Sequence, residues 1–172
     1  MEELSQYALW LLPDTGDTRL IELAMEQINE ALPGPRFVPH ITLFDRLTGD
    51  EAELADKVVT CSEKIASFEA ETEKLMCSQY YFRALYVRLK ASPDMLRCRQ
   101  LGTDAFALRL DKSFKPHISL LYSAASRKKK TSSLADVHLN LPDHYNINRL
   151  ALVRTALAVS DWEIIRELPL GG

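Results

Sequence analysis

The sequence predicts a single domain of mixed helices and strands, built from two lobes of similar design. Its 172 residues match the length of one domain that can bury about two thirds of its unfolded surface. Apolar residues recur at helical spacing in some segments and form short β-rich runs in others. The order strand, Pro-Asp turn, helix and Pro-His-Ile strand occurs twice, which indicates an internal repeat and an approximate two-fold relation between the lobes.

The first half of the chain supplies strand, helix, strand and helix in that order. An apolar run closed by Pro13 and Asp14 predicts a buried strand. Asp17 or Thr18 can cap the helix that follows, which ends at Leu32. The next strand is rich in β-branched and aromatic residues, and the next helix carries one apolar face. The two strands are expected at 7–12 and 37–44, and the second helix at 50–67.

The second half repeats this order after two paired strands that are joined by a turn near Ser78. Ser92 and Pro93 open a third helix, which runs through Phe106. The basic run at 127–130 follows the second Pro-His-Ile strand, and we expect a solvated loop or a flexible rim near the site. The lobe boundary is expected near 68–79, and strands at 73–77, 81–89, 115–122, 137–141, 149–159 and 162–168.

The composition argues against several classes of protein. Lys and Arg number 21 against 24 Asp and Glu, and a net charge of −3 excludes a nucleic-acid binder held mainly by bulk positive charge. Cys61, Cys77 and Cys98 form no Cys-x-x-Cys, so a reducing compartment is expected. Glu2 and Glu3 stand where a signal peptide carries basic residues, and the apolar run at 7–13 is too short to span a bilayer. We therefore expect a cytoplasmic monomer without membrane contact.

The two repeats end in the same polar pattern, a histidine followed two positions later by a hydroxyl. The pairs are His40 with Thr42 and His117 with Ser119. Because side chains at i and i+2 of a strand project to one face, each histidine lies beside its hydroxyl, and the intervening isoleucines point into the core. The other two histidines lack this partner and are expected to be structural: His138 and His144.

Two histidines that share a cleft, without Asp or Cys at metal-ligand spacing, favour proton transfer over metal binding. An ordinary pKa near 6.5 allows one imidazole to be neutral and the other protonated at neutral pH. This pairing suits phosphodiester hydrolysis, in which one histidine takes a proton from water and the other protonates the departing alkoxide. Thr42 and Ser119 are expected to donate hydrogen bonds to the phosphate oxygens.

The doubled motif resembles the 2H phosphoesterase superfamily and, within it, the cyclic phosphodiesterase branch. The similarity covers nearly the whole chain, from a Trp-x-x-Pro opening at Trp10 to a tyrosine that closes the second motif, Tyr122. The resemblance implies a bilobal α+β fold with pseudo-two-fold symmetry, in which two antiparallel sheets line a central cleft and helices lie outside. It implies catalysis without a metal or other cofactor. The implied substrate is small and nucleotide-derived, with a cyclic phosphate on ribose: ADP-ribose 1″,2″-cyclic phosphate or a nucleoside 2′,3′-cyclic phosphate.

The resemblance also implies roles for the site residues. His117 activates water and His40 protonates the leaving group, which is the 3′ oxygen when a nucleoside 2′,3′-cyclic phosphate opens to the 2′-phosphate. The residues themselves leave this assignment open. Tyr122 is expected beside the phosphate, although its position five residues after His117 requires a twist or bulge in the strand.

Two other residues are candidates for substrate contact. Trp10 lies against a base or ribose, or else packs in the core. Lys115 shares a strand face with His117 and attracts phosphate, or else is a solvated lysine. Two alternative functions stay open: an enzyme of the superfamily that acts on RNA ends, as a 2′–5′ RNA ligase or phosphodiesterase does, and a module that binds phosphate without turnover.

Overall fold

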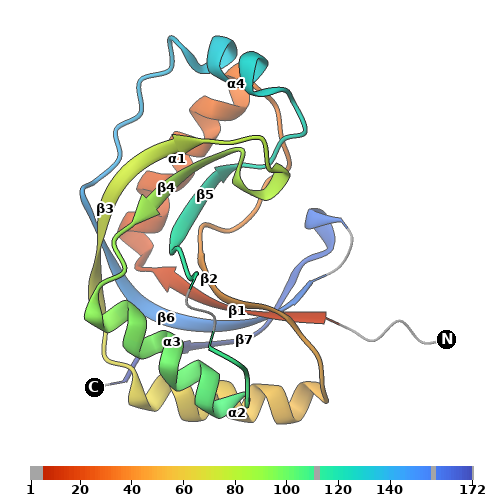
Figure 1. Cartoon of the computed structure of the whole chain (residues 1–172), viewed down its shortest axis with the longest axis vertical. Helices are drawn as coiled ribbons and strands as arrows, with labels where there is room; N and C mark the ends of the chain where they lie inside the picture. The colour runs from red at the N-terminus through yellow and green to blue at the C-terminus, as the bar shows by residue number, and fades with distance from the viewer. Residues whose placement is uncertain (1–5, 111–112, 156–157, 172) are drawn as a thin grey trace, which may run out of the picture.

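The computed structural model of the chain describes residues 6–110, 113–155 and 158–171. This part contains seven strands, four α-helices and two single-turn 3-10 helices, η1 and η2. Figure 1 shows the strands as a strongly curved sheet with helices on its outside. In chain order the elements are β1 (Gln6–Pro13), α1 (Thr15–Ala31), β2 (Ile41–Leu47), α2 (Glu51–Lys64), β3 (Phe68–Cys77), η1 (Tyr81–Arg83), β4 (Leu85–Leu89), α3 (Pro93–Ala105), β5 (His117–Leu121), α4 (Arg127–Leu134), β6 (His144–Thr155), η2 (Val159–Asp161) and β7 (Glu163–Pro169).

The strands form one antiparallel sheet in the order β1-β2-β5-β4-β3-β6-β7, with a further pairing of β1 with β6. The predicted α+β class is confirmed. The two expected sheets are joined at two places. The strands that carry the histidine motifs, β2 and β5, meet through the pair Ile41 and Ile118. The long strand β6 pairs with β3 at its start and with β1 and β7 further along.

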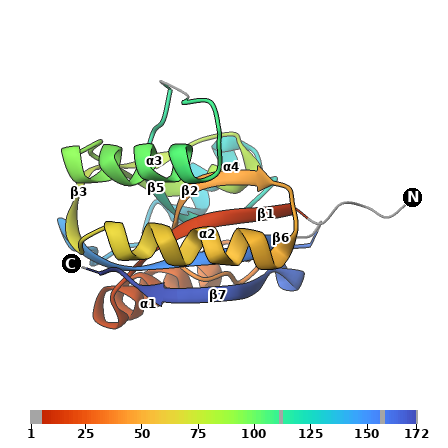
Figure 2. The same ribbon diagram turned by 90° about the horizontal axis from the view of Figure 1, so that it is seen from below.

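The helices pack reciprocally on the strands that carry the motifs. Helix α1 of the first half contacts β5 of the second half, and α3 of the second half contacts β2 of the first. Helix α2 covers β6 and β7, and Figure 2 shows it running beside α3. None of the helices described is long and apolar enough to cross a membrane.

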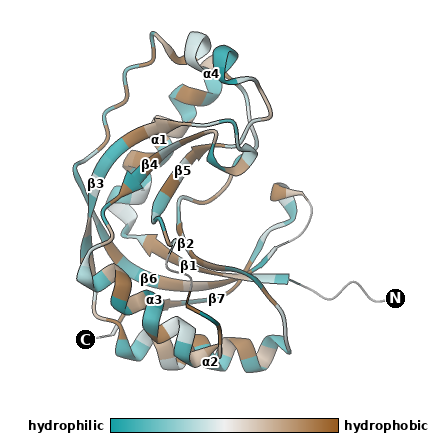
Figure 3. Cartoon of the chain, viewed as in Figure 1, coloured by the Kyte–Doolittle hydropathy of each residue, from teal (hydrophilic) through white to brown (hydrophobic). Residues whose placement is uncertain are grey.

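The core explains why β1 is a continuous apolar run. Tyr7, Leu9 and Leu11 point into the main core, whereas Trp10 lies on the opposite face in a smaller cluster with residues of β6 such as Val153. Both faces of β1 are therefore buried, and the alternation typical of a half-exposed strand is missing. Figure 3 shows this strand and β2 as largely hydrophobic, in contrast to α4.

Several local expectations are wrong, among them the strand expected at 81–89, of which 81–83 form the 3-10 helix η1. Asp14 caps α1, because its carboxylate accepts a hydrogen bond of 2.8 Å from the amide of Asp17, which therefore lies inside the first turn. The segment 37–40 precedes β2 without strand pairing, and 137–141 forms no strand. The basic run is the helix α4, capped by Ser126, and Lys130 within it is fully buried.

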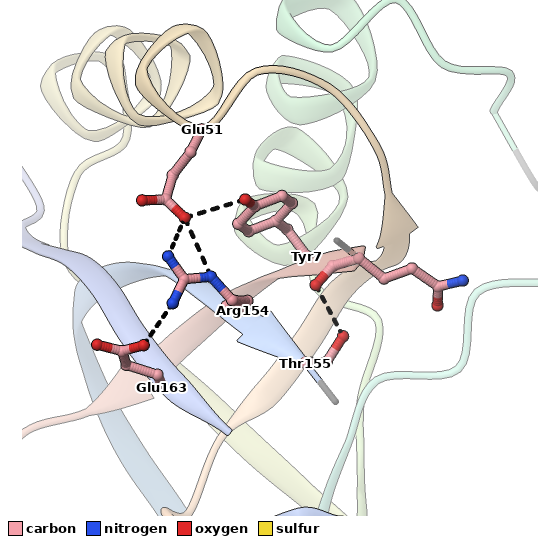
Figure 4. Close-up of polar contacts among 6 residues, drawn as sticks. Tyr7, Glu51, Arg154, Thr155 and Glu163 are labelled. Carbon is pink, nitrogen blue, oxygen red and sulfur yellow. Dashed lines mark hydrogen bonds and ion pairs between the residues drawn. The ribbon is translucent and has the colours of Figure 1, made fainter. Parts of the chain in front are cut away.

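Four elements are joined by a polar network at the start of α2 (Figure 4). Glu51 accepts hydrogen bonds from the hydroxyl of Tyr7 at 2.9 Å and from Nε of Arg154 at 3.1 Å. Arg154 also donates to Glu163 of β7 at 2.5 Å. Hydrogen bonds from Arg154, and then from Tyr7, hold the pKa of Glu51 below its ordinary value. The network fixes the first turn of α2 to the ends of β1, β6 and β7.

Candidate active site

The two histidine motifs line one cavity of about 470 Å³. His40 precedes β2 directly, and His117 is the first residue of β5. Thr42 and Ser119 line the same cavity. The intervening Ile41 and Ile118 are fully buried on the other side of the strands and pair with each other. The structure thus brings together the four residues that the repeat singles out.

The two imidazoles are held in the same way. Nδ1 of His40 lies 2.6 Å from the carbonyl oxygen of Val38, and Nδ1 of His117 lies 2.9 Å from that of Lys115. A carbonyl oxygen only accepts, so Nδ1 carries the proton in each ring. Each Nε2 is then the atom that can take or give a proton.

Burial favours the neutral form of both histidines. It lowers the pKa of His40 to about 4, with a smaller contribution from the charge of His117, while the hydrogen bond to Val38 opposes the shift. The pKa of His117 is also lowered by burial, and further by the positive charges of Arg83 and Arg88, against the opposing hydrogen bond to Lys115. A bound phosphate anion opposes this bias, because a nearby negative charge favours the imidazolium.

Ser119 is hydrogen-bonded to the single-turn helix η1, which contributes to the lining of the cavity. Its hydroxyl donates a hydrogen bond of 2.7 Å to the carbonyl oxygen of Phe82 in η1. A serine has one hydroxyl proton, so donation to a phosphate requires the hydroxyl to turn away from Phe82. Ser119 therefore ties η1 to β5 through this hydrogen bond.

Tyr122 lines the cavity despite its odd offset from His117. The pairing of β4 with β5 shifts by one residue, because Tyr86 pairs with Ser119 but Leu85 pairs with Leu121. This is the irregularity that the sequence required at the strand end. The ring of Tyr122 stacks on Phe37 with centroids 3.7 Å apart, and burial raises the pKa of its hydroxyl, which stays protonated.

The structure places the two remaining candidates differently. Trp10 lines the cavity but is only 3% exposed, and its ring stacks on His40. It therefore packs in the smaller core cluster and supports the histidine at the same time. The side chain of Lys115 lines a neighbouring cavity of about 390 Å³, to which His117 also contributes.

Several residues that line the cavity have no signal in the sequence. Phe82, Arg83 and Trp162 lie in or beside the single-turn helices η1 and η2, which have no periodic pattern. Arg46 lies in β2 with a φ of 55°, where the pairing with β1 is irregular. This left-handed conformation is uncommon for a residue other than glycine. It occurs at a shift in the register between β1 and β2, which can be recognised only once the strand pairing is known.

The chain is similar in sequence and in fold to known proteins. It matches the family described as "Cyclic phosphodiesterase-like protein" over residues 5–170. It is 25% identical to the cyclic phosphodiesterase of Arabidopsis thaliana over 176 aligned positions, which cover 96% of each chain. Among solved structures, it is similar in fold to E. coli LigT in complex with 3′-AMP, with a TM-score of 0.62, 16% identity and coverage of 99% of this chain and 100% of the other. The protein TT0787 of Thermus thermophilus has a TM-score of 0.59 and 18% identity, with coverage of 98% and 99%.

Proposed function

Because the chain belongs to the family of cyclic phosphodiesterase-like proteins, we propose that it hydrolyses a ribose cyclic phosphate by acid–base catalysis between His40 and His117. The observation that carries this proposal is the pair of equivalent imidazoles in one cavity, each held through Nδ1 by the carbonyl two residues before it. The substrate is a nucleoside 2′,3′-cyclic phosphate or ADP-ribose 1″,2″-cyclic phosphate, and the match to the cyclic phosphodiesterase-like family supports a cyclic phosphate as substrate.

In the proposed reaction one neutral imidazole takes a proton from a water molecule as the water oxygen bonds to phosphorus. In a nucleoside 2′,3′-cyclic phosphate the bond from phosphorus to the 3′ oxygen breaks, and the other histidine, as imidazolium, gives that oxygen its proton. The product is the 2′-phosphate with a free 3′ hydroxyl. Thr42 and Ser119 donate hydrogen bonds to the phosphate oxygens, whose negative charge grows in the transition state.

We assign His117 as the base and His40 as the acid. Arg83 and Arg88 favour the neutral form of His117, which a base requires. His40 lies flat against the indole of Trp10, and the face of an aromatic ring attracts a cation, which favours the imidazolium once phosphate binds. Burial of His40 opposes this protonation in the unliganded protein. The substrate anion must therefore offset the cost of burying the charge.

Product analysis tests the proposed reaction. The purified protein is incubated in chelator with a panel of nucleoside 2′,3′-cyclic phosphates and ADP-ribose 1″,2″-cyclic phosphate, and the products are separated and identified by phosphorus NMR. We expect turnover in chelator and release of the 2′-phosphate from the nucleoside substrates. Release of the 3′-phosphate would contradict the assigned leaving group. Binding without any product would leave the non-catalytic module as the better description.

A further inference from the structure

A basic cavity adjoins the catalytic cavity and shares part of its wall. It has a volume of about 390 Å³ and shares four residues with the catalytic cavity: Thr42, Asp45, Arg83 and His117. A ligand seated between the two histidines can therefore extend into it past His117 and Arg83. We call it the basic cavity from here on.

The charge of this cavity is opposite to that of the whole chain. Among the residues that the structure describes, its lining contains four cationic side chains, Arg83, Arg99, Arg109 and Lys115, against one acidic residue, Asp45. The whole chain, in contrast, carries a net charge of −3. A third cavity, of about 880 Å³, meets the catalytic cavity on the other side at Trp10 and Trp162. Its charged lining residues are Arg19, Arg36, Glu22, Glu26 and Glu30. An anionic part of a substrate is thus favoured on the side of the basic cavity.

One cation of the basic cavity is held rigidly. The guanidinium of Arg99 lies over the ring of Phe44 at 4.2 Å and over that of Phe114 at 4.6 Å, and it donates a hydrogen bond to the carbonyl oxygen of Leu43. The ring of Phe44 also packs directly against Gly102 of α3. A Cβ at position 102 would lie 2.4 Å from this ring, so a glycine is required there. A fixed guanidinium supplies positive potential without an entropic cost on binding.

Two other cations are placed to meet a ligand from the solvent side. Arg109 and Lys115 are exposed, line the basic cavity and lie between α3 and β5 in the chain. Lys115 also positions His117 through its carbonyl oxygen, so the basic cavity and the catalytic histidine share one backbone segment. Guanidinium and ammonium groups arranged in this way are suited to the oxygens of a phosphate group.

We propose that the basic cavity binds a second phosphate group of the substrate. The preferred substrates are then cyclic phosphates that carry a further phosphate or diphosphate in the same molecule. This inference rests on the proposed function and adds to it the part of the substrate that lies outside the histidine pair. Arg109 acts in recognition of that group and takes no part in the bond changes at the cyclic phosphate.

The test compares two substrates that differ only in a 5′-phosphate. A nucleoside 2′,3′-cyclic phosphate and its 5′-phosphorylated form are assayed at low ionic strength with the wild type, with Arg109→Ala and with Arg97→Ala. Arg97 is an exposed arginine of α3 outside the basic cavity, so it is the matched control. We expect the wild type to prefer the 5′-phosphorylated substrate by about tenfold or more in kcat/KM, which is the effect of one charged hydrogen bond. Arg109→Ala should lose most of this preference, and Arg97→Ala should keep it.

The outcomes separate the inference from the function on which it rests. Equal kcat/KM for the two substrates, or a preference that survives Arg109→Ala, would overturn the second-phosphate site while leaving the hydrolase proposal intact. Failure to hydrolyse these two substrates and ADP-ribose 1″,2″-cyclic phosphate would overturn the proposed function itself. ADP-ribose 1″,2″-cyclic phosphate distinguishes a diphosphate from a terminal phosphate, since a loss of its turnover in Arg109→Ala identifies the diphosphate as a ligand. A strong preference for an oligoribonucleotide with a 2′,3′-cyclic end, with a steep salt dependence, would instead assign the cavity to RNA.

Discussion

The imidazole of His40 lies flat against the indole of Trp10, with ring centroids 3.6 Å apart and planes 9° from parallel. One tryptophan on a buried strand thus belongs to the core and supports a candidate catalytic residue. The indole shields one face of the imidazole from water, which contributes to the low pKa of His40.

Replacing Trp10 by leucine removes this ring while keeping an apolar side chain. We expect the pKa of His40 to rise from about 4 toward its ordinary value, because burial is the largest cause of its low pKa. The contact with water that the imidazole gains then outweighs the loss of the ring face that attracts the imidazolium. We expect kcat to fall by about tenfold, since a cation–π interaction contributes about 1–2 kcal/mol to a desolvated cation. NMR titration of the imidazole measures the pKa, and initial rates at saturating substrate measure kcat. Trp10→Phe keeps an aromatic face and should change both less. An unaltered His40 pKa in Trp10→Leu would show that the ring does not shield it.

The buried neutral His40 makes the protein sensitive to acid. The pKa is 6.5 in the unfolded chain and about 4 in the folded one, so the unfolded state binds the proton more tightly. The contribution to the free energy of unfolding is therefore complete above pH 6.5 and is lost as the pH falls through 4. Between pH 7.5 and pH 5 we expect a loss of about 2 kcal/mol from this residue. Urea unfolding of the wild type and of His40→Asn at both pH values gives the loss of unfolding free energy for each protein. The difference between the two losses is the contribution of His40. Equal losses in the two proteins would argue against a neutral, buried His40.

Ser119→Ala removes the hydroxyl that donates to Phe82 at 2.7 Å. We expect kcat/KM to fall by about 10²-fold, because a transition-state donor is lost. The free energy of unfolding should also fall, by about 1 kcal/mol, because the carbonyl of Phe82 loses its partner. Ser119→Thr keeps the hydroxyl and should restore most of both quantities. A variant that loses stability but keeps its kcat/KM would limit Ser119 to holding η1.

Lys130 is buried and holds the segment 78–83, part of which lines the site. Its Nζ donates a hydrogen bond of 3.0 Å to the carbonyl oxygen of Ser78, whose own hydroxyl donates to the carbonyl oxygen of Arg83 at 2.6 Å. We expect Lys130→Met to lower the free energy of unfolding by about 1.5–3 kcal/mol, the range for a hydrogen bond to a charged group. KM should rise more than kcat falls, because Arg83 is displaced while the histidines keep their carbonyl partners. Lys128→Met, at an exposed position of the same helix, should change neither quantity. Identical behaviour of the two variants would remove Lys130 from this role.

The candidate site could be predicted from the two-residue periodicity of β-strands together with the internal repeat. His40 and Thr42 are two residues apart, and so are His117 and Ser119. Each pair is therefore expected on one face of its strand, because adjacent strand residues point to opposite faces. The repeat then predicts that the two pairs meet, and the structure brings them into one cavity. The caps of α2 and α3 were likewise predictable, because Asp50 and Ser92 precede clear helical patterns.

The remaining features depend on tertiary contacts that leave no local pattern. The basic run forms a helix because Lys130 finds a carbonyl partner in a loop 52 positions away in sequence, whereas its charge alone indicates a solvated segment. Phe82 reaches the cavity from the single-turn helix η1, and Trp162 from the position directly after η2. Arg46 reaches it from a strand irregularity that is visible only in the register of β1 and β2.

The central claim is that His40 and His117 transfer protons in opposite directions, and a change of leaving group tests it most directly. His40→Ala and His117→Ala are assayed on the cyclic phosphate and on a p-nitrophenyl phosphodiester, whose leaving group needs no protonation. Each variant should lose about 10²–10⁴-fold in kcat on the cyclic phosphate, which is the usual contribution of one proton transfer. On the p-nitrophenyl substrate, His40→Ala should recover most of its rate and His117→Ala should not. Recovery by His117→Ala alone would reverse the two roles, and turnover of the cyclic phosphate at the wild-type rate by either variant would contradict the two-histidine account.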